Sequence, residues 1–272
     1  MQYPNRMNID IIRYCIRHMS SKEIIHQLFD NHSIVYRNSD SYEKLVDRLN
    51  EKDFEKINQS VITKYYRDNW KPTTTKLHIE NLKSGLLFGH NWHGAMPSML
   101  HLSLQNKVRD HIDGKLNLKE LISIGADIMK HEYFMVAAHD LCETLIIQTF
   151  PNTIPPLGSK SISDFIYEEI PYDLKITNYF AGQTKEFVNK NKQAVAEQLL
   201  AGADVLRIRE QAKKTINNWG LNRFYFLVED QDRWIENPEG VLIELVKEVK
   251  ELKTPFVVKI DGIEIKVQLI AI

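Results

Sequence analysis

The chain has 272 residues, 43% of them apolar, so it can bury a sizeable core as one large domain or two smaller ones. Its 35 basic and 36 acidic residues nearly cancel, which disfavours binding of nucleic acid through bulk charge and requires any DNA contact to use local basic patches. The sequence begins with no basic-then-apolar leader and contains no apolar run of membrane-spanning length, so we expect a cytoplasmic protein with no membrane partner.

The first 75 residues have the pattern of a helical region. Apolar residues recur at helical spacing from Ile9 to Met19, and a Ser20–Glu23 capping box precedes a second helix. Further helices are predicted over 42–49 and 54–66. We therefore expect residues 1–75 to form a separate helical module.

Two short helices within this region, 21–29 and 42–49, are predicted to flank a polar loop. The pair resembles the SAP motif, a small DNA-binding pair of helices. A plain bundle of helices is the alternative reading of the same spacing. The helical region is accordingly a candidate module for DNA binding or for dimerisation.

The remaining residues, 76–272, are predicted to form one α/β domain, after a boundary marked by Trp70, Pro72 and a run of threonines. Its first part reads as three separate helices over 96–104, 116–129 and 133–150. Its second part reads as a hairpin over 162–178, a helix over 193–216, a strand over 224–228, a helix over 238–252 and a hairpin over 255–270 with an Asp261-Gly262 turn. This order predicts a mixed β-sheet flanked by helices.

Three charged residues of the first hairpin are predicted to share one face. Side chains alternate along a strand, so Asp173 and Lys175 project together. A turn centred on Glu168 and Glu169 would place Asp164 opposite Asp173 on the neighbouring strand. Two carboxylates and an ammonium group would then converge.

Geometry distinguishes this hairpin from the other places where an acid precedes a lysine by two positions. The chain contains five such triplets. The triplet at 113–115 lies in a predicted loop. Those at 248–250 and 251–253 lie on a predicted helix, where positions two apart do not face each other. The triplet at 264–266 lies on a predicted strand, but its nearest upstream acid, Asp261, belongs to a turn. Only Asp173-Leu174-Lys175 has a strand-borne acid at hairpin distance.

This arrangement suits the hydrolysis of a phosphodiester bond. Two neighbouring carboxylates repel each other, and a divalent cation such as Mg²⁺, which prefers hard oxygen ligands, relieves that repulsion. The ammonium group of Lys175 would orient or deprotonate the attacking water and offset charge developing on the phosphate. The alternative is a solvated hairpin face with one cross-strand ion pair and no chemistry.

The stretch from 133 to 228 resembles the PD-(D/E)XK nuclease superfamily. Ser163-Asp164 stands in the place of the family's Pro-Asp, Asp173-Leu174-Lys175 in that of its second element, and Glu143 lies on a preceding helix. The resemblance implies a restriction-endonuclease-like core. It also implies metal ligation by Asp164, Asp173 and the main-chain carbonyl of Leu174, with Lys175 and Glu143 in the catalytic set.

The resemblance further implies a Mg²⁺-dependent endonuclease that cleaves double-stranded DNA. A large helical N-terminal region without helicase or polymerase motifs is most like a type II restriction enzyme, which usually acts as a homodimer. A structure-specific repair nuclease shares the same core. A non-enzymatic DNA-binding or assembly protein is the alternative from a different class.

Two other patterns are open to a functional reading. His90, His93 and His101 invite a zinc interpretation, but no cysteine or nearby carboxylate completes a tetrahedral set. Basic residues that follow the hairpin are candidates for phosphate contacts, although each is also a plausible solvated helix residue. They are Lys185, Lys190, Lys192, Arg207, Arg209, Lys213 and Lys214.

Overall fold

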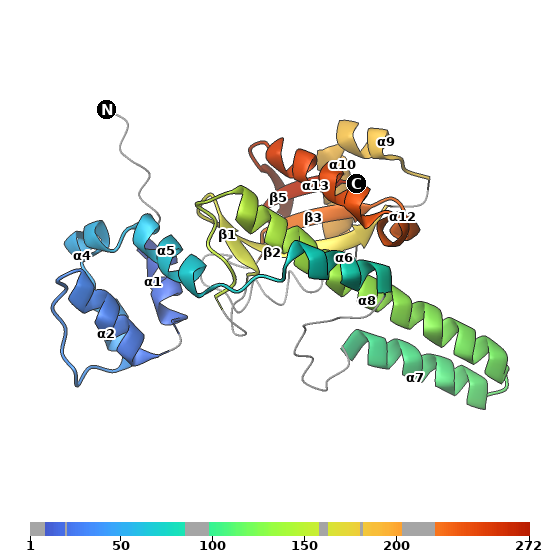
Figure 1. Cartoon of the computed structure of the whole chain (residues 1–272), viewed down its shortest axis with the longest axis horizontal. Coiled ribbons are helices and arrows are strands. Elements are labelled where there is room, and N and C mark those ends of the chain that lie inside the picture. The colour runs from blue at the N-terminus through green and yellow to red at the C-terminus, as the bar shows by residue number, and fades with distance from the viewer. Residues whose placement is uncertain (1–8, 20, 85–97, 158–162, 180–181, 203–220) are drawn as a thin grey trace.

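A five-stranded mixed sheet forms the centre of the C-terminal part of the protein (Figure 1). The computed structural model describes residues 9–19, 21–84, 98–157, 163–179, 182–202 and 221–272. The strands are β1 (Phe165–Tyr167), β2 (Ile170–Asn178), β3 (Arg223–Val228), β4 (Phe256–Ile260) and β5 (Ile263–Ala271), in the spatial order β1-β2-β3-β5-β4. The three central strands are parallel, and β1 and β4 pair antiparallel at the two edges. The predicted helix-flanked mixed sheet is confirmed.

Helices cover both faces of this sheet. All six residues of β3 are buried, and alternate side chains point to opposite faces. Phe224 and Phe226 pack in a core with α8 and α13, whereas Tyr225 and Leu227 pack in a second core with α9 and α10. These helices are α8 (Leu118–Thr149), α9 (Lys185–Lys190), α10 (Lys192–Ala201) and α13 (Pro238–Lys250).

The remaining described helices lie before the sheet or between its strands. They are α1 (Ile9–Arg17), α2 (Lys22–Asn31), α3 (Tyr42–Asp47), α4 (Glu51–Lys56), α5 (Gln59–Asn69), α6 (Thr75–Ser84), α7 (Ser98–Ile112) and α12 (Gln231–Glu236). Of these, α6 and α12 were not predicted. Within the described ranges, no helix is long and apolar enough to cross a membrane.

The predicted helix over 54–66 is wrong, because two helices occupy this stretch. The first ends at Lys56 with Ile57 as its C-cap, and Asn58 begins the second as its N-cap, since its side chain accepts hydrogen bonds from the backbone N–H groups of Ser60 and Val61. The start of α2 also differs from the prediction. Its N-cap is Ser21, whose side chain accepts from the N–H of Ile24, and Ser20 of the predicted capping box lies outside the described residues.

The predicted separation between helices over 116–129 and 133–150 is also wrong, because α8 is one continuous helix of 32 residues. Two of the polar residues between the predicted helices have partners on α12. Lys130 pairs with Asp232 at 3.2 Å, and a ring nitrogen of His131 lies 2.9 Å from Gln231 Oε1. The first half of α8 lies alongside α7, and this helical hairpin projects from the body of the protein (Figure 1).

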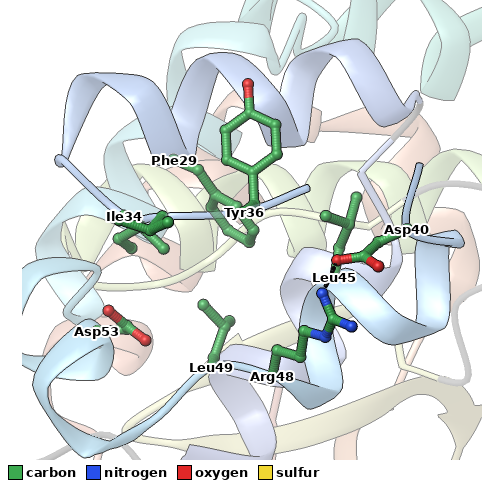
Figure 2. Close-up of a pocket in the computed structure, with 9 residues that line it drawn as sticks. Phe29, Ile34, Tyr36, Asp40, Leu45, Arg48, Leu49 and Asp53 are labelled. Atoms are coloured by element: carbon green, nitrogen blue, oxygen red, sulfur yellow. Dashed lines mark hydrogen bonds and ion pairs between the residues drawn. The ribbon is translucent and has the colours of Figure 1, made fainter. Parts of the chain in front are cut away.

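The N-terminal helices α1 to α5 share an apolar core of their own. Three residues from beyond α8, namely Ile154, Leu157 and Ile166 of β1, pack into the same core. The helices α2 and α3, which suggested a SAP-like pair, flank a small pocket lined by residues that include Phe29, Tyr36 and the Asp40–Arg48 ion pair (Figure 2). The DNA-binding role of this pair and the domain boundary at residue 75 stay predictions.

The closing hairpin is confirmed. Asp261 and Gly262 both have positive φ angles, 50° and 79°, as a two-residue type I′ turn requires. The helix predicted over 193–216 is described only as far as Ala201, where α10 ends. His90, His93 and the four basic residues between 207 and 214 lie outside the described residues, as does the side chain of His101.

Arg67 joins the N-terminal helices to the end of α8, and we expect its replacement by alanine to destabilise the fold. Its guanidinium donates to the carbonyl oxygens of Ile147, Phe150 and Thr153 at 2.9, 3.3 and 3.1 Å. Losing a charged donor to partly buried carbonyls should lower the free energy of unfolding by about 2–3 kcal/mol in urea denaturation. The control is Lys64→Ala on the same helix, which removes only an exposed pair with Asp68 and should change it by less than about 0.5 kcal/mol. Equal effects would contradict this role for Arg67.

Candidate functional site

The hairpin of β1 and β2 has the turn and the pairing that the sequence predicts. Glu168 and Glu169 adopt positive φ angles of 49° and 62°, and Tyr167 pairs with Ile170 across them. The N–H of Asp164 donates to the carbonyl of Tyr172 at 2.8 Å, one position before β1 begins. The same register places Asp164 across from Asp173.

Asp173 and Lys175 lie on one face of β2 and contact each other. Lys175 Nζ is 2.7 Å from Asp173 Oδ1, and Arg223 Nη1 is 3.3 Å from Asp173 Oδ2. Arg223 stands opposite Asp173 on β3, and its side chain is 0% exposed. Asp173 is itself 6% exposed, so two cations neutralise a buried carboxylate.

Asp164 is held at the edge of β2 by a main-chain hydrogen bond. Its Oδ2 accepts from the N–H of Leu174 at 2.6 Å. The neighbouring N–H of Asp173 points the other way, to the carbonyl of Asn222. Because the N–H and C=O of one strand residue point to the same side, the carbonyl of Leu174 also faces the edge that Asp164 occupies.

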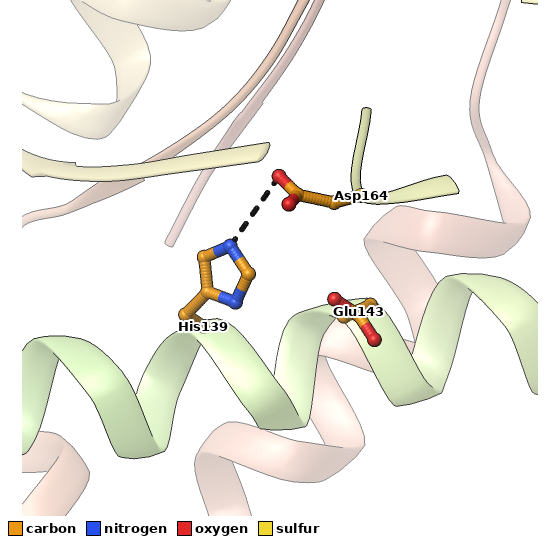
Figure 3. Close-up of side chains that lie close together, drawn as sticks. All are labelled: His139, Glu143 and Asp164. Atoms are coloured by element: carbon orange, nitrogen blue, oxygen red, sulfur yellow. Dashed lines mark ion pairs between the residues drawn. The ribbon is translucent and has the colours of Figure 1, made fainter. Parts of the chain in front are cut away.

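Two side chains of α8 face Asp164 from across the hairpin edge (Figure 3). His139 and Glu143 are four residues apart, so they lie on the same face of the helix. His139 Nε2 is 3.6 Å from Asp164 Oδ2. One ligand atom from each of the three residues lies within 4.8 Å of the other two, and all three side chains are half-buried.

The three groups alter each other's protonation. The pKa of Glu143 is raised to about 8, chiefly by burial, with His139 opposing the rise and the charges of Asp164 and Asp140 adding to it. Burial alone would lower the pKa of His139, but the negative charges of Asp164 and Glu143 raise it above its ordinary value. Burial would likewise raise the pKa of Asp164, but His139, the Leu174 amide and Lys175 lower it.

The predicted site residues thus fall into two adjoining groups. Glu143 and Asp164 lie together, joined by His139, while Asp173 and Lys175 lie together, joined by Arg223. The sequence reading did not include His139 or Arg223. The spacing of His139 and Glu143 on one helix was a signal for the histidine, whereas the burial of Arg223 depends on strand pairing that no local pattern reveals.

The residues present fit a divalent cation at the first group. The donors are two carboxylates and an imidazole, with the carbonyl of Leu174 facing the same edge. A half-buried carboxyl with a raised pKa beside a second carboxylate is the electrostatic situation that a cation relieves. In the second group, two cations already neutralise Asp173.

The described basic residues that were candidates for phosphate contacts have partners within the protein. Lys185 forms ion pairs with Glu244 and Glu248, and Lys192 donates to the carbonyl of Leu269 at 3.1 Å. Lys190 is exposed and pairs with Glu186 on its own helix. Of the three, Lys190 is the one most accessible to a phosphate.

Comparisons with protein-family models, with curated proteins and with solved structures found no match to this chain.

The raised pKa of Glu143 predicts a specific pH dependence of stability in EDTA. In the unfolded chain this carboxyl titrates near its ordinary value of 4.5, and in the folded protein near 8. Between these two pH values the folded protein keeps a proton on Glu143 that the unfolded chain releases. The contribution of Glu143 to the free energy of unfolding is therefore largest below pH 4.5 and is lost as the pH rises to about 8. The neutral variant Glu143→Gln should therefore gain stability relative to the original protein between pH 5 and 8 in thermal melts. A constant difference across that range would contradict the prediction.

Removal of the guanidinium of Arg223 should destabilise the protein strongly. Arg223→Met keeps an apolar stem but leaves the buried Asp173 with Lys175 alone, which should cost about 3–5 kcal/mol in chemical denaturation. Arg17→Met is the control, because Arg17 pairs with Asp47 in the solvent and should contribute at most about 1 kcal/mol. A loss for Arg223→Met no larger than for the control would show that the buried pair is not structural.

Proposed function

We propose that this protein is a metal-dependent endodeoxyribonuclease of the PD-(D/E)XK type, which hydrolyses phosphodiester bonds of duplex DNA. The observation that carries the proposal is the meeting of Glu143 from α8 with Asp164 at the start of the hairpin. Across the hairpin from Asp164, Asp173 and Lys175 stand two positions apart on β2 and contact each other. Two segments, α8 and the hairpin of β1 and β2, thus contribute to this one edge of the sheet.

The order of elements around the site supports a restriction-endonuclease-like core. A helix carrying an acid precedes a hairpin, and helices α9 and α10 then lead toward β3, which pairs parallel to β2. This connection brings the chain back beside the strand that carries Asp173 and Lys175. The core residues of α8, β1, β2 and β3 pack together, so the site lies on a rigid support.

Asp164 and Glu143 would hold the divalent ion, together with the carbonyl of Leu174, and the resemblance adds Asp173 to this set. The ion, Mg²⁺ in our proposal, would supply positive charge at the phosphate and lower the pKa of a bound water. Lys175 pairs with Asp173, and its charge also acts on Asp164. Its ammonium group would orient the attacking water and offset negative charge on the phosphate, while Asp173 fixes its position.

The substrate class follows from the resemblance. We propose sequence-specific cleavage by a homodimer, as in type II restriction enzymes, with a structure-specific repair nuclease as the variant that shares the same chemistry. One observation favours a non-enzymatic DNA-binding or assembly protein instead. Because Arg223 and Lys175 both neutralise Asp173, the hairpin charges form a self-sufficient structural cluster without a metal.

A digest of DNA separates these functions. Purified protein with supercoiled and linear DNA should give discrete fragments in Mg²⁺ and none in EDTA, and nicking without discrete fragments would indicate structure-specific cleavage. Lys175→Ala should lower the cleavage rate by about 100-fold or more, as for loss of a group that stabilises a transition state. Asp164→Asn should do the same by weakening metal binding.

The chain offers a matched control in its second hairpin. Glu264-Ile265-Lys266 repeats the acid-x-lysine spacing on β5, and Glu264 forms an exposed pair with Lys259. Lys266→Ala should therefore leave cleavage unchanged. Full activity of an Asp164→Asn, Lys175→Ala double variant, with melting temperatures matched to the original protein, would refute the nuclease proposal.

A further inference from the structure

His139 occupies the position of a third ligand in the group formed with Glu143 and Asp164. It precedes Glu143 by one turn of α8, and Figure 3 shows its ring directed toward Asp164. Its Nε2 is 3.6 Å from Asp164 Oδ2, beyond the length of an ordinary hydrogen bond. The two side chains therefore approach as an ion pair, in which a bound cation would replace the proton of the imidazole.

The spacing suits two donors that share one ion. Ligands about 2.1 Å from an octahedral ion are separated by about 3.0 Å when adjacent and about 4.2 Å when opposite. The 3.6 Å between His139 and Asp164 lies between these limits, and the ligand atoms of all three residues lie within 4.8 Å of one another. Small side-chain movements would complete the coordination.

An imidazole ligand changes which ion such a site prefers. Mg²⁺ is a hard ion that favours an all-oxygen shell, whereas first-row transition ions accept imidazole nitrogen and carboxylate oxygen together. We propose that His139 is a metal ligand and that the site formed by His139, Glu143 and Asp164 binds Mn²⁺ in preference to Mg²⁺. This inference rests on the metal-binding role in the proposed function and replaces Mg²⁺ with Mn²⁺ as the ion that the site prefers.

The preference can be measured without DNA. The EDTA-stripped full-length chain is titrated with MnCl₂ and with MgCl₂ in a calorimeter. Mn²⁺ also binds many all-oxygen sites more tightly than Mg²⁺ does. The test is therefore how much the ratio of Mn²⁺ affinity to Mg²⁺ affinity changes when His139 is replaced. His139→Ala should weaken Mn²⁺ binding by about 10-fold or more and change Mg²⁺ binding by a smaller factor.

Three further measurements secure the assignment. His131→Ala is the matched control, because His131 lies on the same helix, contacts Gln231 and should leave both affinities unchanged. His139→Asp replaces the nitrogen donor with an oxygen donor, so the ratio of Mn²⁺ affinity to Mg²⁺ affinity should fall. Pulsed electron paramagnetic resonance of bound Mn²⁺ should show coupling to an imidazole nitrogen that disappears in His139→Ala.

The outcomes distinguish this inference from the nuclease proposal. Unchanged Mn²⁺ affinity in His139→Ala, or absence of the nitrogen coupling in the original protein, would overturn the role of His139 even if the protein cleaves DNA in Mg²⁺. Selective Mn²⁺ binding that depends on His139 would support it even if no DNA is cleaved. Melting temperatures in EDTA show whether each variant folds, and if His139→Ala fails to fold, the nitrogen coupling decides the question.

Discussion

The carboxylate of Asp164 contacts both the backbone of β2 and the side chains of α8, and the rest of the site depends on these two contacts. Its Oδ2 accepts a short hydrogen bond from the backbone of Leu174, which fixes the carboxylate against the edge of β2. The same oxygen faces His139, with Glu143 beside it. Because the main chain of β2 holds Asp164 in place, Asp164 cannot move away from Glu143 to relieve the repulsion between the two carboxylates. A proton or a cation must therefore offset their negative charge.

The fold holds both sides of this contact in place. The apolar side chains of α8 pack in the same core as those of β1, β2 and β3, so His139 and Glu143 are fixed relative to the hairpin. Arg67 links the end of α8 to the N-terminal helices, and Ile154 and Ile166 extend the core of those helices to the hairpin. The N-terminal region therefore packs against the end of α8 and against the hairpin that carries Asp164, whether or not it also contacts DNA.

The local features of the site were predictable, and the non-local ones were not. Period-2 alternation and a two-residue turn determine the hairpin register, so Asp164, Asp173 and Lys175 could be placed from the sequence alone. Glu143 came from the family resemblance, because nothing local ties a helix to a hairpin twenty residues later. The burial of Arg223 and the continuity of α8 through Lys130 both depend on partners supplied by other elements, β2 and α12, which periodicity does not reveal.

The tight turn at Glu168 and Glu169 limits how this segment can vary among related chains. Neither residue is glycine, yet both adopt left-handed backbone angles, which glycine or asparagine would adopt at lower cost, so the two-residue length of the loop imposes this geometry. Adding or deleting one residue there would exchange the two faces of the short edge strand and carry Asp164 away from α8. A variant that retains this cluster must therefore keep the eight positions that separate the two aspartates, and it must avoid proline and β-branched residues at the bend.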